Sequence, residues 1–137
     1  MTRIALALLF ATGLATAAAE AHHSHADFAL DRDATVTGTI EGIRFQNPHV
    51  LIVVRTDAST TYTAEWQGAQ WLQTHPELVA AGSSPLTSST LKLGDHVVLV
   101  GSPARDTALR TLIIKEVRRP SDGWQWSCRQ PGMKRAC

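Results

Sequence analysis

The fold is decided by residues 34–45, which read ATVTGTIEGIRF. Up to Ile40, apolar and polar residues alternate, as they do in a β-strand with one buried face. After Gly42 the apolar residues change phase and fall at Ile43 and Phe45. One extra residue in a strand exchanges its two faces, so a change of phase at a glycine indicates a β-bulge. We therefore predict one long, bent strand here.

Four further strands follow from alternation or apolar runs bounded by turn residues. Their predicted positions are residues 50–54, 61–66, 96–100 and 111–117. The run at 50–54 is apolar throughout, which is typical of a strand buried on both faces. Residues 68–82 favour a helix that is interrupted or restarts near Pro76.

Five strands with one short helix between the third and the fourth indicate a mainly all-β protein. The pattern matches a small OB-like barrel, in which five antiparallel strands form a partly open Greek key. Another small β-meander or sandwich is the alternative.

Composition agrees with an ordinary folded domain. The chain has 137 residues, of which 44% are hydrophobic and 18% charged, so disordered and collagen-like proteins are excluded. The formal net charge is only +1, which does not suit a protein that coats nucleic acid. The length allows one domain with tails.

The N-terminal residues have the pattern of a signal peptide. Arg3 supplies a positive charge, residues 4–14 are free of charge, and small residues follow up to Ala19 and Ala21. The run is too short to cross a bilayer, which takes about 20 apolar residues. We expect cleavage near Ala19 or Ala21 and a periplasmic or secreted mature protein without a transmembrane segment.

The rest of the chain divides by composition. We expect four parts: a signal peptide at 1–21, a His-rich arm at 22–33, the barrel at 34–120 and a basic tail at 121–137. The tail contains Cys128 and Cys137, with a Pro-Gly turn between them. In an oxidising compartment they are expected to form a disulfide that closes a small loop. Intermolecular pairing and a free thiol pair are the alternatives.

Short motifs occur in a defined order along the chain. They are AHHS at 21–24, VTGTI at 36–40, NPH at 47–49, LGD at 93–95 and PSDG at 120–123. In this the chain resembles a family of small exported bacterial proteins of unknown function, whose members have an AHHSF-type mature N-terminus and a TNPH turn. His25 and Gln46 depart from that pattern, since the family usually has an aromatic residue and a threonine there. The resemblance implies an OB-like envelope protein and no established activity.

The chemistry of the chain is concentrated in histidine. His22, His23 and His25 lie within four residues, and imidazole is a ligand for copper, nickel, iron and zinc. If cleavage makes His22 the first residue, its amine and imidazole can chelate one ion. If Glu20 is first, the amine, backbone amides and His22 form a square-planar set suited to Cu(II) or Ni(II).

We therefore predict a copper site with His22 as the primary ligand, His23 and His25 as secondary ligands and His49 as a remote one. Zinc is the second choice, because its structural sites usually include cysteine. The alternative is an arm that is merely soluble and flexible.

Catalytic templates such as G-x-S-x-G, H-E-x-x-H and phosphate-binding glycine loops are absent from the sequence, so we do not expect an enzyme. Metal carriage or buffering is the first functional hypothesis. The second is a non-metal module that binds an envelope protein or an anionic surface. It would use Tyr62, Trp66, Trp71 and the basic tail. Nucleic acid is not an expected partner of an exported protein.

Overall fold

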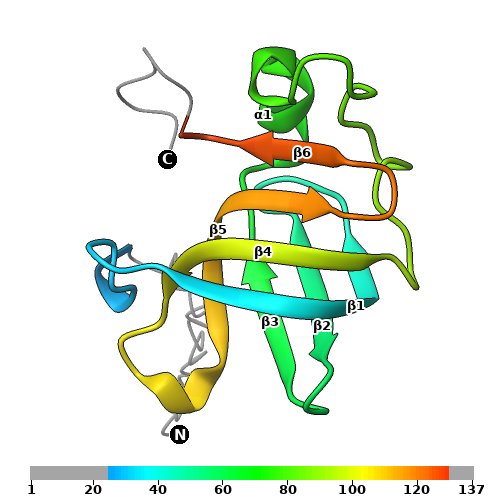
Figure 1. The fold of residues 1–137 in the computed structure, drawn as a ribbon. Helices are drawn as coiled ribbons and strands as arrows, with labels where there is room; N and C mark the ends of the chain where they lie inside the picture. The colour runs from blue at the N-terminus through cyan, green and yellow to red at the C-terminus, as the bar shows by residue number, and fades with distance from the viewer. Residues whose placement is uncertain (1–24, 130–137) are drawn as a thin grey trace, which may run out of the picture.

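The strand predicted around residues 34–45 is β1 (Ala34–Arg44) in a computed structural model that describes residues 25–129. The register of β1 against its neighbour β2 (Leu51–Thr56) shifts between Ile40 and Gly42. This is the predicted bulge, at the predicted glycine. It lets one strand bend around the molecule and pair with two partners, as Figure 1 shows.

The remaining strands are β3 (Thr61–Glu65), β4 (His96–Pro103), β5 (Thr111–Arg119) and β6 (Trp124–Ser127). Their order in the sheet is β3-β2-β1-β4-β5-β6, with antiparallel neighbours throughout. A parallel pairing of β3 with β5 closes the first five strands into a barrel. The predicted all-β, five-stranded, OB-like barrel is therefore confirmed.

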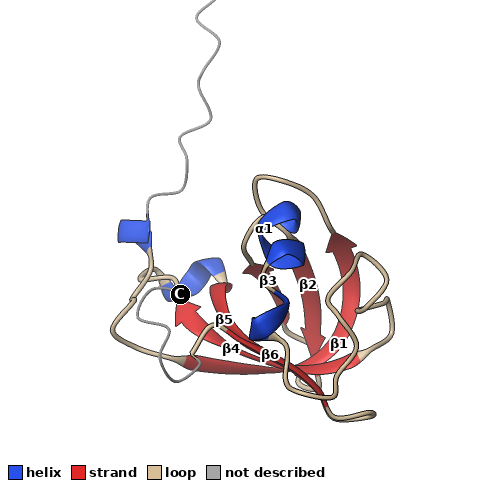
Figure 2. Cartoon of the chain, turned by 90° about the horizontal axis from the view of Figure 1, so that it is seen from above, coloured by secondary structure: helices blue, strands red, loops and turns tan. Residues whose placement is uncertain are grey.

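A short helix, α1 (Ala69–Thr74), lies between β3 and β4 as predicted. A 3-10 turn, η2 (Pro76–Leu78), follows it, because a proline cannot continue the α-helical hydrogen bonds. Figures 1 and 2 together place α1 at one end of the barrel. Two further 3-10 turns are η1 (His25–Asp27) and η3 (Thr107–Leu109). Within residues 25–129, no helix has the length and apolar character needed to cross a membrane.

The sixth strand was not predicted, since residues 121–137 were assigned to a basic tail. β5 pairs with β3 through its first residues and with β6 through its last ones, so β6 extends the sheet beyond the barrel closure. Trp124 and Trp126 of β6 are only 2% and 1% exposed. The ring of Trp126 meets that of Trp66 edge to face, with centroids 4.9 Å apart. Part of the expected tail is thus core structure.

The core lies inside the barrel and under α1. Val50, Ile52 and Val54 are fully buried, whereas Leu51 and Val53 between them are half-buried. The expectation that β2 is buried on both faces is therefore wrong. In a barrel one strand face points inward and the other outward, so an apolar run can still have unequal faces.

Candidate functional site

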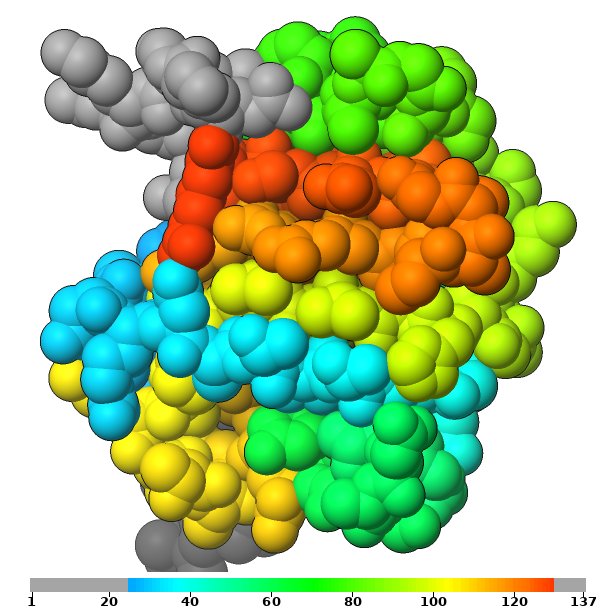
Figure 3. Space-filling view, in the orientation of Figure 1, coloured from blue at the N-terminus to red at the C-terminus, as the bar shows by residue number. Residues whose placement is uncertain are grey.

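The His-rich arm is attached to the barrel immediately after His25, which is exposed at the start of η1. Phe28 is buried and forms an antiparallel bridge with Ala104. The Arg105 side chain donates from Nε to the carbonyl of Ala26 at 2.9 Å, and its backbone N–H donates to Asp27 at 2.8 Å. In Figure 3 these arm residues, in blue, lie on the surface beside the yellow segment after β4. His25 therefore has a fixed attachment point.

His49 lies between β1 and β2, with its side chain 44% exposed. Its Nδ1 atom is 3.3 Å from the Trp66 carbonyl and 3.3 Å from Oε1 of Glu65. Both neighbours are acceptors, so they favour the tautomer that is protonated at Nδ1. Nε2 then keeps its lone pair for an outside ligand, as in histidines that bind metals.

The two described histidines of the predicted copper set do not meet. His25 precedes the segment that packs beside the end of β4, whereas His49 packs at the end of β3. Among residues 25–129, no three His, Cys, Asp or Glu side chains are grouped so that they could hold a metal ion. His22 and His23 lie outside the described residues, as does the signal peptide predicted at 1–21. The copper site stays a prediction.

The aromatic residues of the second hypothesis are unevenly exposed. Trp66 is buried in the barrel core, where it can contact no partner. Tyr62 and Trp71 are half-buried, and the Trp71 ring stacks on His75 with centroids 4.0 Å apart. Cys128 is only 2% exposed. Its predicted disulfide partner lies outside the described residues, so that bond also stays a prediction.

One carboxylate pairs with a cation of the expected basic tail and with a cation of β5. Asp33, at the end of the arm, accepts two bonds from Arg129 at 2.5 and 2.6 Å and one from Lys115 at 3.0 Å. Hydrogen bonds from Arg129, and secondly from Lys115, lower the pKa of Asp33 below its usual value. Figure 3 shows the end of the described chain, in red, against the start of β1, in cyan. Lys115 and Arg129 are thus paired with an acid of the same protein.

A second ionic cluster surrounds Arg119, the last residue of β5. Its guanidinium donates to Asp122 at 2.7 and 3.0 Å, to Asp95 at 2.8 Å and to the Thr90 carbonyl. Hydrogen bonding to Asp122 is the main cause that raises the pKa of Arg119, with Asp95 adding to it and partial burial opposing it. Arg119 in turn lowers the pKa of Asp122, which also accepts the N–H of Trp124.

This second cluster forms one wall of an open polar hollow with a volume of about 550 Å³. The other walls are the loop before β4 and the turn between β5 and β6. Sequence reasoning missed the hollow, because its residues are far apart in the chain. The LGD and PSDG motifs, which contain Asp95 and Asp122, were the only signal of it.

The chain matches a known protein family. Residues 11–112 match a family described as Family of unknown function (DUF6152). The match covers most of the chain, so the protein belongs to this family of small β-barrel proteins of unknown function. The predicted resemblance is thereby confirmed. No curated protein matches the sequence.

Proposed function

We propose that this protein is an exported copper-binding protein that carries or buffers the metal through His22, His23 and His25. The observation that supports the proposal most is the attachment of the arm. His25 is exposed, while Phe28, three residues later, is buried against the barrel. His25, the one described member of the three, therefore lies next to a point where the chain is fixed to the barrel.

The chemistry of the segment favours copper over other divalent metals. Nitrogen ligands bind Cu(II) more tightly than Mn(II), Fe(II), Co(II), Ni(II) or Zn(II) in the usual order of affinities. The neutral imidazole nitrogen is among the commonest metal ligands in proteins. His49 offers Nε2 on the same protein, but the described residues do not place it beside His25.

The test is a Cu(II) titration of the exported, processed protein by calorimetry and electron paramagnetic resonance. We expect one tight site, and at least a tenfold loss of affinity in the double variant His22→Ala/His23→Ala, which is about 1.4 kcal/mol. His96→Ala is the matched control, because His96 is exposed on β4, away from the arm. Equal affinity in the double variant and the control would refute the arm as the copper site.

The second candidate function is an envelope-binding module that needs no metal. The polar hollow beside Arg119 is the observation that favours it, because the hollow is outside the arm. A pull-down from envelope extract with and without residues 130–137 tests the tail part of this hypothesis. Deleting all of 121–137 would instead remove β6 with its buried tryptophans and so destabilise the barrel.

A further inference from the structure

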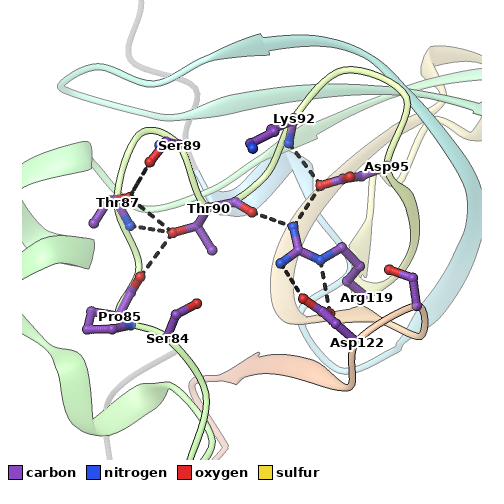
Figure 4. A pocket seen from close by; sticks show the side chains of 10 residues that line it. Ser84, Pro85, Thr87, Ser89, Thr90, Lys92, Asp95, Arg119 and Asp122 are labelled. Atoms are coloured by element: carbon purple, nitrogen blue, oxygen red, sulfur yellow. Dashed lines mark hydrogen bonds and ion pairs between the residues drawn. The ribbon is translucent and has the colours of Figure 1, made fainter.

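The polar hollow has hydroxyl groups on one side and ionic groups on the other. Figure 4 shows Thr87, Ser89 and Thr90 on the first side, and Arg119 with Asp122 on the second. Its volume of about 550 Å³ falls in the usual range of small-molecule sites, roughly 300–1,000 Å³. Such sites are mostly apolar, and this one is not. Its ligand must therefore be hydrophilic.

The loop that forms the hydroxyl side is held in place. Leu86 and Leu91 are buried in the core, 4% and 6% exposed. The Thr90 hydroxyl donates to the Pro85 carbonyl at 3.0 Å and accepts the N–H of Thr87 at 2.7 Å. The indole of Trp124 donates to the carbonyl of Ser84 at 2.9 Å. A site built this way keeps its shape without a ligand, which lowers the entropy cost of binding.

The charges in the hollow exclude simple ion binding. Arg119 already binds two carboxylates and one carbonyl, so an anion arriving there would meet Asp95 and Asp122. A metal ion between the same two carboxylates would meet the guanidinium. Lys92 adds one positive charge, so the four charged side chains together have no net charge. The electrostatic field of these four side chains does not disfavour an uncharged ligand.

Several polar groups in the hollow have bonding capacity left. Within the described residues, the hydroxyls of Ser84 and Ser121 have no hydrogen-bond partner, and Lys92 forms no ion pair. Asp95 uses Oδ2 for Arg119 and for the Lys92 N–H, which leaves Oδ1. A sugar hydroxyl can donate to such a carboxylate oxygen and accept from an ammonium at the same time.

From this set of groups we propose that the hollow is a binding site for a neutral saccharide. The ring hydroxyls would donate to Asp95 Oδ1 and accept from the Lys92 ammonium and from Ser121. Aromatic side chains are not among the residues that line the hollow, so hydrogen bonds supply the affinity, and we expect it to be weak. His25 and His49, the described residues of the predicted copper set, are not among the residues that line the hollow.

The test uses the full processed protein and amide chemical-shift mapping by NMR. The probes are glucose, maltose and N-acetylglucosamine as neutral sugars, with glucuronate and glucosamine as the charged counterparts. We expect at least one neutral sugar to shift the amides of Ser89, Lys92 and Ser121. We also expect it to bind more tightly than either charged sugar. Tighter binding of glucuronate than of every neutral sugar, or no shift with any neutral sugar at millimolar concentration, would overturn the proposal.

Variants separate this site from the rest of the surface. Lys92→Ala and Ser121→Val should each weaken the sugar about fivefold or more, roughly 1 kcal/mol. Arg44→Ala is the control, since Arg44 is an exposed cation at the end of β1 that does not line the hollow. Equal binding by all three variants would contradict the assignment. The His22→Ala/His23→Ala protein should bind sugar normally, so failure of the copper proposal and of this one are distinguishable.

Discussion

Arg119 and Asp33 each hold separate parts of the chain together, but with opposite charge arrangements. Arg119 is one cation between two acids, and it joins the start of β4 to the turn before β6. Asp33 is one acid between two cations, and it joins the arm to β5 and to the residue after Cys128. The Arg119 side chain is 13% exposed and that of Asp33 is 39% exposed.

Burial decides how much each cluster contributes. Water and salt screen an exposed ion pair, so such pairs stabilise a fold by about 0–1 kcal/mol. A more buried charge that loses its partner is costly, because the remaining charge has little water around it. We therefore expect Arg119 to matter for global stability and Asp33 to matter mainly for the attachment of the arm.

The largest expected effect is that of Arg119→Met. The substitution leaves Asp95 and the Thr90 carbonyl without their cation, and we expect a loss of about 3 kcal/mol of unfolding free energy. Urea denaturation measures it. Arg118→Met is the matched control, because Arg118 is the preceding residue, 49% exposed, and pairs only with Glu116 among the described residues. It should change stability by less than about 0.5 kcal/mol.

Equal losses of unfolding free energy in Arg119→Met and Arg118→Met would show that burial does not determine how much these ion pairs stabilise the fold. Should Arg119→Met fail to fold, Arg119→Lys supplies the second measurement. Lysine keeps the charge but cannot form the two parallel bonds that Asp122 accepts. An intermediate loss is expected there, and full wild-type stability would contradict a structural role of the planar guanidinium.

Asp33→Asn should have a smaller effect, about 1 kcal/mol, because the carboxylate is partly exposed. Its effect should shrink as salt is raised above about 0.1 M, where charges more than roughly 10 Å apart are screened and exposed pairs weaken. Thermal unfolding at low and high salt measures this. Faster hydrogen exchange at the Ala29 amide, which bonds to the Pro103 carbonyl, would report a loosened arm. A loss of stability that does not depend on salt would mean that the ion pairs of Asp33 are shielded from solvent as those of Arg119 are.

Local sequence patterns predicted those parts of the barrel in which a single segment shows a recognisable pattern of its own. The bulge in β1 was predictable, because Gly42 changes the apolar phase within twelve residues. The break between α1 and η2 was predictable from Pro76. β6 was not predicted, although its sequence WQWS alternates, because the run has only four residues and the arginines and lysines around it suggested a solvated tail. In its buried position Trp126 packs against Trp66, which lies sixty residues earlier in the chain.

The two candidate sites also differ in how far the sequence predicts them. A histidine cluster within four residues is visible in the sequence, and His25, the one member that the structure describes, is exposed. The hollow depends on Arg119 meeting Asp95, which are 24 residues apart. Such a contact follows from the closure of the barrel and from the pairing of β4 with β5, which a single sequence does not display.

The smallest expected effect is the dependence of the Asp33 cluster on pH. The folded-state pKa of Asp33 lies below its unfolded value of 3.8, so its contribution is present above that pH and is lost as the pH falls through the folded pKa. Asparagine does not titrate. Between about pH 6 and pH 3, the urea midpoint of Asp33→Asn should therefore fall slightly less than that of the wild type. An equal fall in both proteins would mean that Arg129 and Lys115 do not favour the ionised carboxylate, and that other contacts, such as those of Phe28 and Arg105, hold the arm.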